Sequence, residues 1–375
     1  MAITFLEKYQ KIEIKEIEEV INNTRDSDIK AILNKESLSL NDFFRLLSPE
    51  AEKHLKPMAE KARLLTQQHF GKTMQFYVPL YLSNECSNSC LYCGFQRNAD
   101  IDRKTLNLEE IEGEIKYLRE IGFQNILLLT GEAPKTAGVD YIVEAIKIAR
   151  KYFTYISLEI FSATEEDYKK FIAAGASGLT IYQETYHYPT YITLHPQGLK
   201  KNFEWRISTA DRALKAGFRK IGLGSLLGLY EWRYEAAFLG VHANYLMKQF
   251  WKSEISISFP RLRDMGKNFA TDYKVKDINL LQMILSLRLF LPWIGLVLST
   301  RETPALRDHL LETGITQMSA ESKTTPGGYK DETSSGEQFS VADQRSLKEL
   351  MLTLQQKGFD PVLKDWVEDF QGIKY

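Results

Sequence analysis

Eight short apolar segments alternate with amphipathic segments from residue 76 onward, and this alternation constrains the fold more than any other feature. Residues 125–130 form a continuous apolar run, the type that is buried on both faces of a parallel sheet. The segment before it has apolar residues at helical spacing after Asn107, a capping residue, and ends at Gly122. The expected strands are 76–82, 125–130, 155–160, 179–182, 220–224, 254–258, 295–298 and 315–319.

Strict alternation of strands and helices indicates a parallel sheet with right-handed crossovers. Eight such units predict a closed (βα)8 TIM-type barrel, whose chemistry lies at the carboxyl ends of the strands. A doubly wound open sheet is the alternative.

The first 75 residues show helical patterns and no strand pattern, so we interpret 1–75 as an N-terminal helical extension. Ser48 followed by Pro49 marks the start of one helix, and Asn41 is expected to cap a shorter one. The barrel then takes up 76–375, with a C-terminal helix and tail, and 327–336 reads as a loop.

Composition excludes several classes of protein. Hydrophobic residues make up 44% of the chain and charged residues 26%, as in ordinary globular proteins. The formal net charge is −1 and basic residues form no long run, so nucleic acid is not an expected partner. The sequence has no apolar run of the roughly 20 residues that span a bilayer, and its start lacks the layout of a signal peptide. A cytoplasmic location is therefore expected.

The three cysteines of the chain, Cys86, Cys90 and Cys93, all fall within eight residues at the spacing C-x3-C-x2-C. An odd, clustered set argues against a disulfide framework. Thiolates are soft ligands that select zinc, copper(I) or iron–sulfur clusters. Three thiolates hold three irons of a cubane and leave the fourth iron open. A zinc site completed by a distant histidine and a set of unrelated buried thiols are the alternatives.

This motif, with Tyr92 before its last cysteine, resembles the signature of the radical S-adenosylmethionine (SAM) superfamily. The resemblance implies a [4Fe–4S] cluster on Cys86, Cys90 and Cys93. It also implies S-adenosyl-L-methionine bound at the open iron and cleaved to a 5′-deoxyadenosyl radical.

Within that superfamily the barrel resembles the 2-iminoacetate synthases, the tyrosine lyases of thiamine thiazole biosynthesis. A related tyrosine lyase of hydrogenase maturation carries extra C-terminal cysteines, whereas no cysteine follows Cys93 here. The segments that carry the likeness are 81–84, 130–132, 182–187, 258–263, 298–302 and 364–366.

The same resemblance implies a set of cofactor-binding residues. Gly131 and Glu132 meet the amino group of the cofactor, although Thr130 replaces the first glycine of the family's segment. Glu184 and Arg206 hold its amino acid end. Tyr92 belongs to the same set, and Glu159, which ends the third expected strand, is placed to accept hydrogen bonds from the ribose.

The implied catalytic residues are Arg301 and Ser299, which follow the seventh expected strand. A free amino acid needs a planar cationic fork for its carboxylate, and arginine provides one. Arg261 and Arg263 end the sixth expected strand. They either lie at the mouth of the pocket or are simply solvated, and the sequence favours neither interpretation. His187 could also reach the site, but a structural role is the expected one for a lone histidine.

The resemblance implies a carbon–carbon lyase that converts L-tyrosine to 2-iminoacetate (dehydroglycine) and p-cresol. Reduced flavodoxin or ferredoxin is the implied electron donor, and a thiazole synthase protein is the implied recipient of the imine. The alternatives are a lyase for another aromatic amino acid such as tryptophan, a non-catalytic metal-binding barrel, and ordinary barrel hydrolase or aldolase chemistry.

Overall fold

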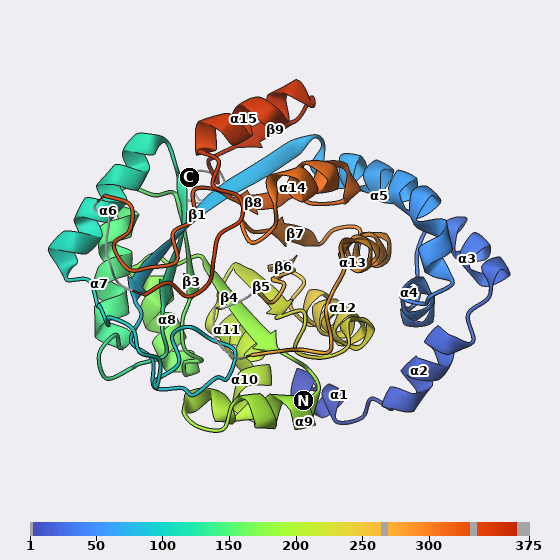
Figure 1. Ribbon diagram of the computed structural model, residues 1–375, viewed down its shortest axis with the longest axis horizontal. Helices are drawn as coiled ribbons and strands as arrows, with labels where there is room; N and C mark the ends of the chain where they lie inside the picture. Colours follow the sequence, from blue (N-terminus) through green and yellow to red (C-terminus); the bar gives the residue numbers. More distant parts are fainter. Residues whose placement is uncertain (1–2, 264–268, 331–335, 366–375) are drawn as a thin grey trace, which may run out of the picture.

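Eight parallel strands close into a barrel in the computed structural model, which describes residues 3–263, 269–330 and 336–365 (Figure 1). Each strand pairs with the next along the chain, and β1 pairs with both β2 and β8, which closes the ring. The predicted (βα)8 barrel is therefore confirmed, and the open sheet is excluded. The strands are β1 Thr73–Ser83, β2 Asn125–Thr130, β3 Tyr155–Glu159, β4 Gly178–Glu184, β5 Lys220–Ser225, β6 Glu254–Ser258, β7 Gly295–Leu298 and β8 Gln317–Ser319.

Helices surround the barrel. The capping residue and the glycine noted in the sequence mark the start and the end of the first of them. Asn107 caps α6 through a reciprocal capping box with Glu110, and Gly122 ends that helix in the left-handed region. The helices of the barrel are α6 Leu108–Ile121, α7 Val139–Arg150, α8 Glu165–Ala174, α9 Tyr188–Leu194, α10 Phe203–Ile207, α11 Thr209–Ala216, α12 Trp232–Gln249, α13 Asp277–Phe290, α14 Pro304–Leu310 and α15 Leu347–Gln356, with 3-10 turns Leu199–Lys201 and Leu311–Thr313.

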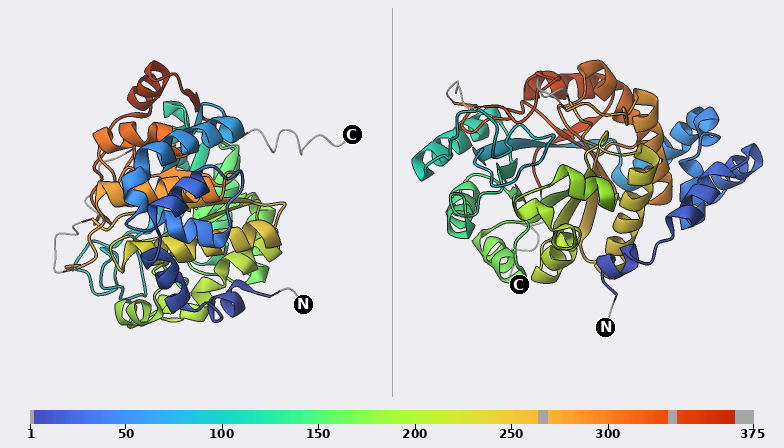
Figure 2. Two further views of the ribbon diagram at one scale, coloured as in Figure 1. Left: turned by 90° about the vertical axis from the view of Figure 1, so that its right-hand side faces the viewer. Right: turned by 60° about the horizontal axis from the view of Figure 1, so that its bottom comes forward.

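Residues 3–70 wrap around one side of the barrel, over α12 and α13 (Figures 1 and 2). Phe5 and Phe43 are fully buried in the same core as the barrel residues. The division at residue 75 stays a prediction, since extension and barrel share this core. The elements are α1 Phe5–Tyr9, α2 Ile14–Asn22, α3 Asp26–Leu33, α4 Leu40–Leu46, the 3-10 turn Ala51–His54 and α5 Leu55–Phe70.

Three details differ from the expectations. Ser39, not Asn41, caps α4, because its hydroxyl accepts from the Asp42 N–H while the Asp42 carboxylate returns to the Ser39 N–H. The sequence of 205–216 predicts a single helix, whereas the structure divides this segment into α10 and α11 at Ser208. A short strand, β9 Asp360–Val362, pairs with the start of β1.

Some expectations fall partly outside the described residues. These are the middle of the 327–336 loop and the last residue of the 364–366 segment. Among the described helices, none is both long and apolar enough to cross a membrane.

Candidate active site

The predicted site residues come together at the carboxyl ends of the strands. A space of about 110 Å³, here called the upper pocket, is lined by the three cysteines and by eight further predicted residues. These eight are Tyr92, Thr130, Gly131, Glu132, Glu159, Glu184, Arg206 and Arg301. Ser299 lines a smaller adjoining space, the middle pocket, which Arg301 and Glu159 share with the upper pocket.

Buried polar contacts hold the loop that carries the cysteines. Asn88 is 1% exposed; its amide donates to Glu132 at 2.9 Å and its carbonyl accepts from the Lys200 backbone N–H at 3.0 Å. The Ser87 N–H and hydroxyl both donate to the Glu132 carbonyl. A Cβ at Gly131 would lie 2.1 Å from the Glu85 carbonyl oxygen, so only glycine lets this loop approach the end of β2.

The spacing of the three sulfurs argues against a single zinc ion. Thiolates around one tetrahedral zinc lie about 3.8 Å apart, given a Zn–S distance of about 2.3 Å. Among the described residues, the Sγ atoms of Cys86, Cys90 and Cys93 do not all lie within 4.8 Å of one another. His195 cannot complete such a site, because its ring nitrogens contact the Tyr92 hydroxyl and the Tyr191 carbonyl. Three soft thiolate ligands in one loop suit a metal cluster.

The cysteine thiols are protonated in the metal-free protein. Burial raises the pKa of the Cys90 and Cys93 thiols, while the nearby Lys200 ammonium opposes the rise. Because metal binding requires thiolates, loading the site releases protons.

Two acids and two cations alternate along one wall of the upper pocket, next to the cysteine loop. Glu132 accepts from Arg206 at 2.8 Å, Arg206 lies 3.7 Å from Glu184, and Glu184 accepts from Lys200 at 2.6 Å. Burial alone would raise the pKa of Glu184, but Lys200 and Arg206 outweigh it and the pKa is lowered. The wall is formally neutral and presents both signs of charge, which suits an amino acid zwitterion.

Glu184 sits on a strained backbone that buried groups hold in place. Its φ of +69° lies in the left-handed region, where residues other than glycine are uncommon, and the β4–β5 register shifts at this point. Directly after it, the Thr185 hydroxyl donates to the fully buried Glu235 carboxylate, which also accepts from the Tyr186 N–H at 3.0 Å. Glu235 therefore fixes the turn that aims Glu184 into the pocket.

Thr130 and Glu159 offer oxygen atoms to the same space. The Thr130 hydroxyl is buried without a hydrogen-bond partner among the described residues, so it is available to a bound molecule. Burial, followed by the charge of Glu184, raises the pKa of Glu159 to about 7. At neutral pH this carboxyl group can therefore act as donor or acceptor.

Arg301 is a cation without a carboxylate partner. Its guanidinium lies over the Phe339 ring, 3.3 Å from the centroid, and no ion pair to it is found in the described part of the chain. The Ser299 hydroxyl accepts from the Arg301 N–H at 3.4 Å, which places both residues on one turn after β7. Gln338, beside Phe339, accepts from the Tyr81 hydroxyl at 2.6 Å and closes this side.

Three residues considered from the sequence lie in different surroundings. Arg261 is held by Glu302 and by Asp277 and does not line either pocket. Arg263 does line the upper pocket. His187 stacks on Tyr230 with ring centroids 3.8 Å apart, which makes it structural.

Sequence reasoning missed several residues of the site, among them Lys200, Asn88, Gln338 and Phe339. Lys200 lies in a 3-10 turn between helices, and Asn88 lies between two cysteines. Nothing in the sequence marks Lys200, whereas a polar residue inside the metal-binding loop was a usable signal for Asn88.

Comparisons with known proteins agree with this geometry. Residues 80–237 match the radical SAM superfamily model, and 258–360 match the biotin and thiamin synthesis associated domain. The 2-iminoacetate synthases of Salmonella typhimurium and Escherichia coli are 41% and 40% identical over 364 residues, 97% of each chain. The X-ray structure of the FeFe-hydrogenase maturase HydG from Carboxydothermus hydrogenoformans superposes with a TM-score of 0.84 at 34% identity, covering 96% of this chain and 82% of that one.

A closed barrel with a three-cysteine loop at the carboxyl end of its first strand defines a radical SAM protein. Membership in this superfamily implies an iron–sulfur cluster and S-adenosylmethionine. Within it, the chain belongs to the 2-iminoacetate synthase family.

Proposed function

We propose that this chain is a lyase that cleaves the Cα–Cβ bond of L-tyrosine to 2-iminoacetate and p-cresol for thiamine thiazole biosynthesis. Arg301 carries the proposal, because a guanidinium without a carboxylate partner beside the cofactor pocket suits the carboxylate of a free amino acid. The names of the relatives, which match over nearly the whole chain, support the same reaction.

The proposed cluster is of the [4Fe–4S] type, on Cys86, Cys90 and Cys93. When bound, it and S-adenosyl-L-methionine supply a 5′-deoxyadenosyl radical after one-electron reduction. Three thiolates and one open metal position match the cysteine count.

The remaining residues of the upper pocket bind and orient S-adenosyl-L-methionine. Glu132 and Glu184 would accept from the ammonium of the cofactor, and Arg206 and Lys200, which pair with them, would attract its carboxylate. Tyr92, Thr130 and Gly131 line the same pocket, and Glu159 would hydrogen-bond to the ribose.

Substrate binding and exclusion of water fall to the middle pocket. Arg301 binds the tyrosine carboxylate, and the Ser299 hydroxyl offers a further hydrogen bond to the substrate. The segment with Gln338 and Phe339 shields this side from solvent, which keeps a reactive species close to its target.

The same proposal includes two protein partners. Reduced flavodoxin or ferredoxin supplies two electrons per turnover, one for cleavage of the cofactor and one that is taken up with a proton when the fragment left by Cα–Cβ cleavage becomes p-cresol. A thiazole synthase protein accepts the imine directly, because an imine in free solution hydrolyses readily.

Anaerobic turnover of the reconstituted protein with L-tyrosine, S-adenosyl-L-methionine and a reductant tests the activity. We expect p-cresol and 5′-deoxyadenosine in about equal amounts. Deoxyadenosine without p-cresol contradicts the tyrosine assignment and leaves the radical class intact. Parallel reactions with tryptophan measure specificity.

Thr185→Val tests the support beneath Glu184. The variant keeps the side-chain shape and removes the hydroxyl that bonds Glu235. A hydrogen bond to a charged group is worth about 1.5–3 kcal/mol, so we expect the Kd for S-adenosyl-L-methionine to rise about tenfold with tyrosine binding unchanged. Calorimetric titration measures both.

Thr193→Val is the matched control, because that hydroxyl lies on the exposed face of α9 and bonds only the Pro189 carbonyl. It should leave both affinities unchanged. Equal S-adenosyl-L-methionine affinity in Thr185→Val and wild type would show that the Glu235 contact does not position Glu184.

A further inference from the structure

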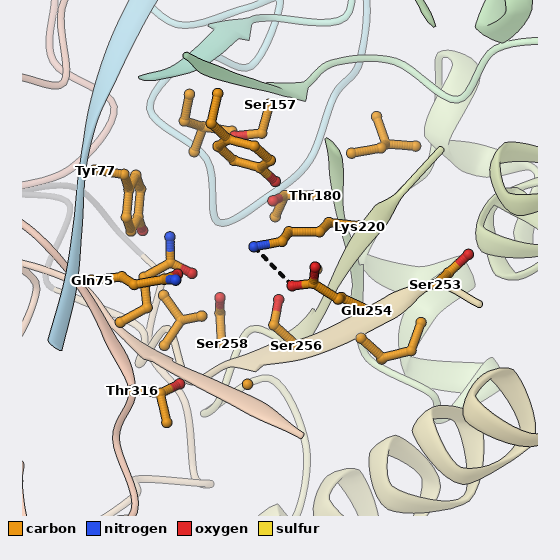
Figure 3. Close-up of a pocket in the computed structure, with 18 of the residues that line it drawn as sticks. Gln75, Tyr77, Ser157, Thr180, Lys220, Ser253, Glu254, Ser256, Ser258 and Thr316 are labelled. Carbon is orange, nitrogen blue, oxygen red and sulfur yellow. Dashed lines mark ion pairs between the residues drawn. The ribbon is translucent and has the colours of Figure 1, made fainter. Parts of the chain in front are cut away.

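A second and larger cavity lies inside the barrel toward the amino ends of the strands, and we call it the lower chamber. Its volume is about 510 Å³, within the range of roughly 300–1,000 Å³ typical of ligand pockets. Hydroxyl side chains point into it from several sides (Figure 3). They are Ser157, Thr180, Ser256, Ser258 and Thr316.

Small residues create this space. The interior of a (βα)8 barrel is normally filled by layers of bulky branched side chains. Here Gly222 and Gly295 occupy lumen positions of β5 and β7, beside Thr180 and Ser256. A Cβ at Gly222 would lie 2.8 Å from the Thr180 hydroxyl oxygen, and one at Gly295 would lie 3.0 Å from the Ser256 Cβ. The hollow is thus built into the strands.

The chamber combines an aromatic rim with a neutral, hydrogen-bonding wall. Trp251 and Trp293 at the rim are 75% and 68% exposed. Lys220 and Glu254 are the only charged groups among the described lining residues, and they pair at 2.8 Å (Figure 3). Lys220 also lies 3.3 Å from Asp365. This surface suits an uncharged molecule with an aromatic face and a hydroxyl group.

The lower chamber adjoins the active site. Four side chains, Tyr77, Leu127, Tyr182 and Ser258, line both the chamber and the middle pocket beneath Arg301. These side chains therefore form a boundary that the chamber shares with the space below Arg301. The upper side of the middle pocket faces the cofactor-binding wall instead.

We propose that the lower chamber binds a small neutral phenol and is the exit route for p-cresol, an inference that rests on the proposed function. Charge separates the two products of that reaction. The imino acid carries a carboxylate, which is attracted to the unpaired Arg301, whereas each charge among the described lining residues of the chamber is paired. The phenol is neutral, and the hydroxyl groups of the lower chamber can form hydrogen bonds with it.

The test measures binding of p-cresol itself to the reconstituted enzyme by saturation-transfer NMR and equilibrium dialysis. Ser256→Leu fills the chamber from β6 without touching the upper or middle pocket. We expect it to raise the p-cresol Kd about tenfold or more and to leave the tyrosine KM within about twofold. Trp251→Ser removes one rim aromatic from an exposed position that folding does not require and should weaken p-cresol binding about threefold.

Tyr117→Ser, on the outer face of α6 and 39% exposed, is the matched control and should leave p-cresol binding unchanged. Unaltered p-cresol affinity in both chamber variants, or competition between p-cresol and tyrosine for one site, overturns the proposal. The turnover assay distinguishes the proposed lyase reaction from the proposed exit route. If p-cresol forms but its Kd is the same in the chamber variants and the wild type, only the exit route is wrong. If p-cresol binds in the chamber but is never formed, only the proposed function fails.

Discussion

Arg301→Met is expected to reduce kcat/KM for tyrosine about 10²- to 10³-fold, because two charge-assisted hydrogen bonds to a carboxylate are together worth about 3–4 kcal/mol. Methionine keeps the length and the apolar stem, so contact with Phe339 is retained in part. S-adenosyl-L-methionine binding should not change, since the charges assigned to it belong to the wall of Glu132, Arg206, Glu184 and Lys200.

The conservative variant Arg301→Lys separates charge from shape. Lysine keeps the cation and loses the planar fork, so it should recover only part of the lost kcat/KM. Arg119→Met, on the surface of α6, makes the same substitution away from the pockets and should have no effect. Steady-state assays with tyrosine varied measure all three variants. A wild-type tyrosine KM in Arg301→Met would remove Arg301 from the substrate site.

Most of the fold could be predicted from the sequence because each element carries its own signal. The apolar run of β2 and the capping box before α6 are local patterns, and strict alternation leaves few topologies open. The errors have local causes. Ser39 and Asn41 are both good caps, and only the Asp42 side chain, which reaches back to Ser39, decides between them. The strand β9 has three residues and contains Pro361, so its pattern is too short to stand out.

The site was predictable where its residues follow strand ends or crowd together in sequence. Glu159 and Glu184 end strands, and the cysteines lie within one loop. Lys200 could not be predicted from the sequence, because only its 2.6 Å ion pair with Glu184, 16 residues away, places it in the site.

The lower chamber escaped detection for a different reason. Ser157, Gly222, Ser256 and Gly295 look like ordinary interruptions of apolar strands. Their common position in the lumen follows only from the register between strands, for example Gly222 with Ser256 and Ser256 with Gly295. A sequence pattern read one strand at a time does not reveal a cavity that several strands build together.

Cys90→Ser is expected to leave the protein without an intact iron–sulfur centre and to reduce p-cresol formation at least about 10³-fold. A serine hydroxyl is a harder, far less acidic ligand than a thiol, and the cluster would keep two of its three protein ligands. Folding should survive, because Cys90 is one small side chain and the loop is anchored independently through Asn88.

Leu91→Ser is the control for this variant, since it introduces the same residue one position away, at a side chain that is 48% exposed. It should retain iron, sulfide and turnover. Iron and sulfide counts with an anaerobic absorption spectrum give the readout independently of activity. A Cys90→Ser protein with a full iron complement and wild-type turnover would contradict the assignment of Cys90 as a ligand, and with it the three-thiolate site on which the reaction depends.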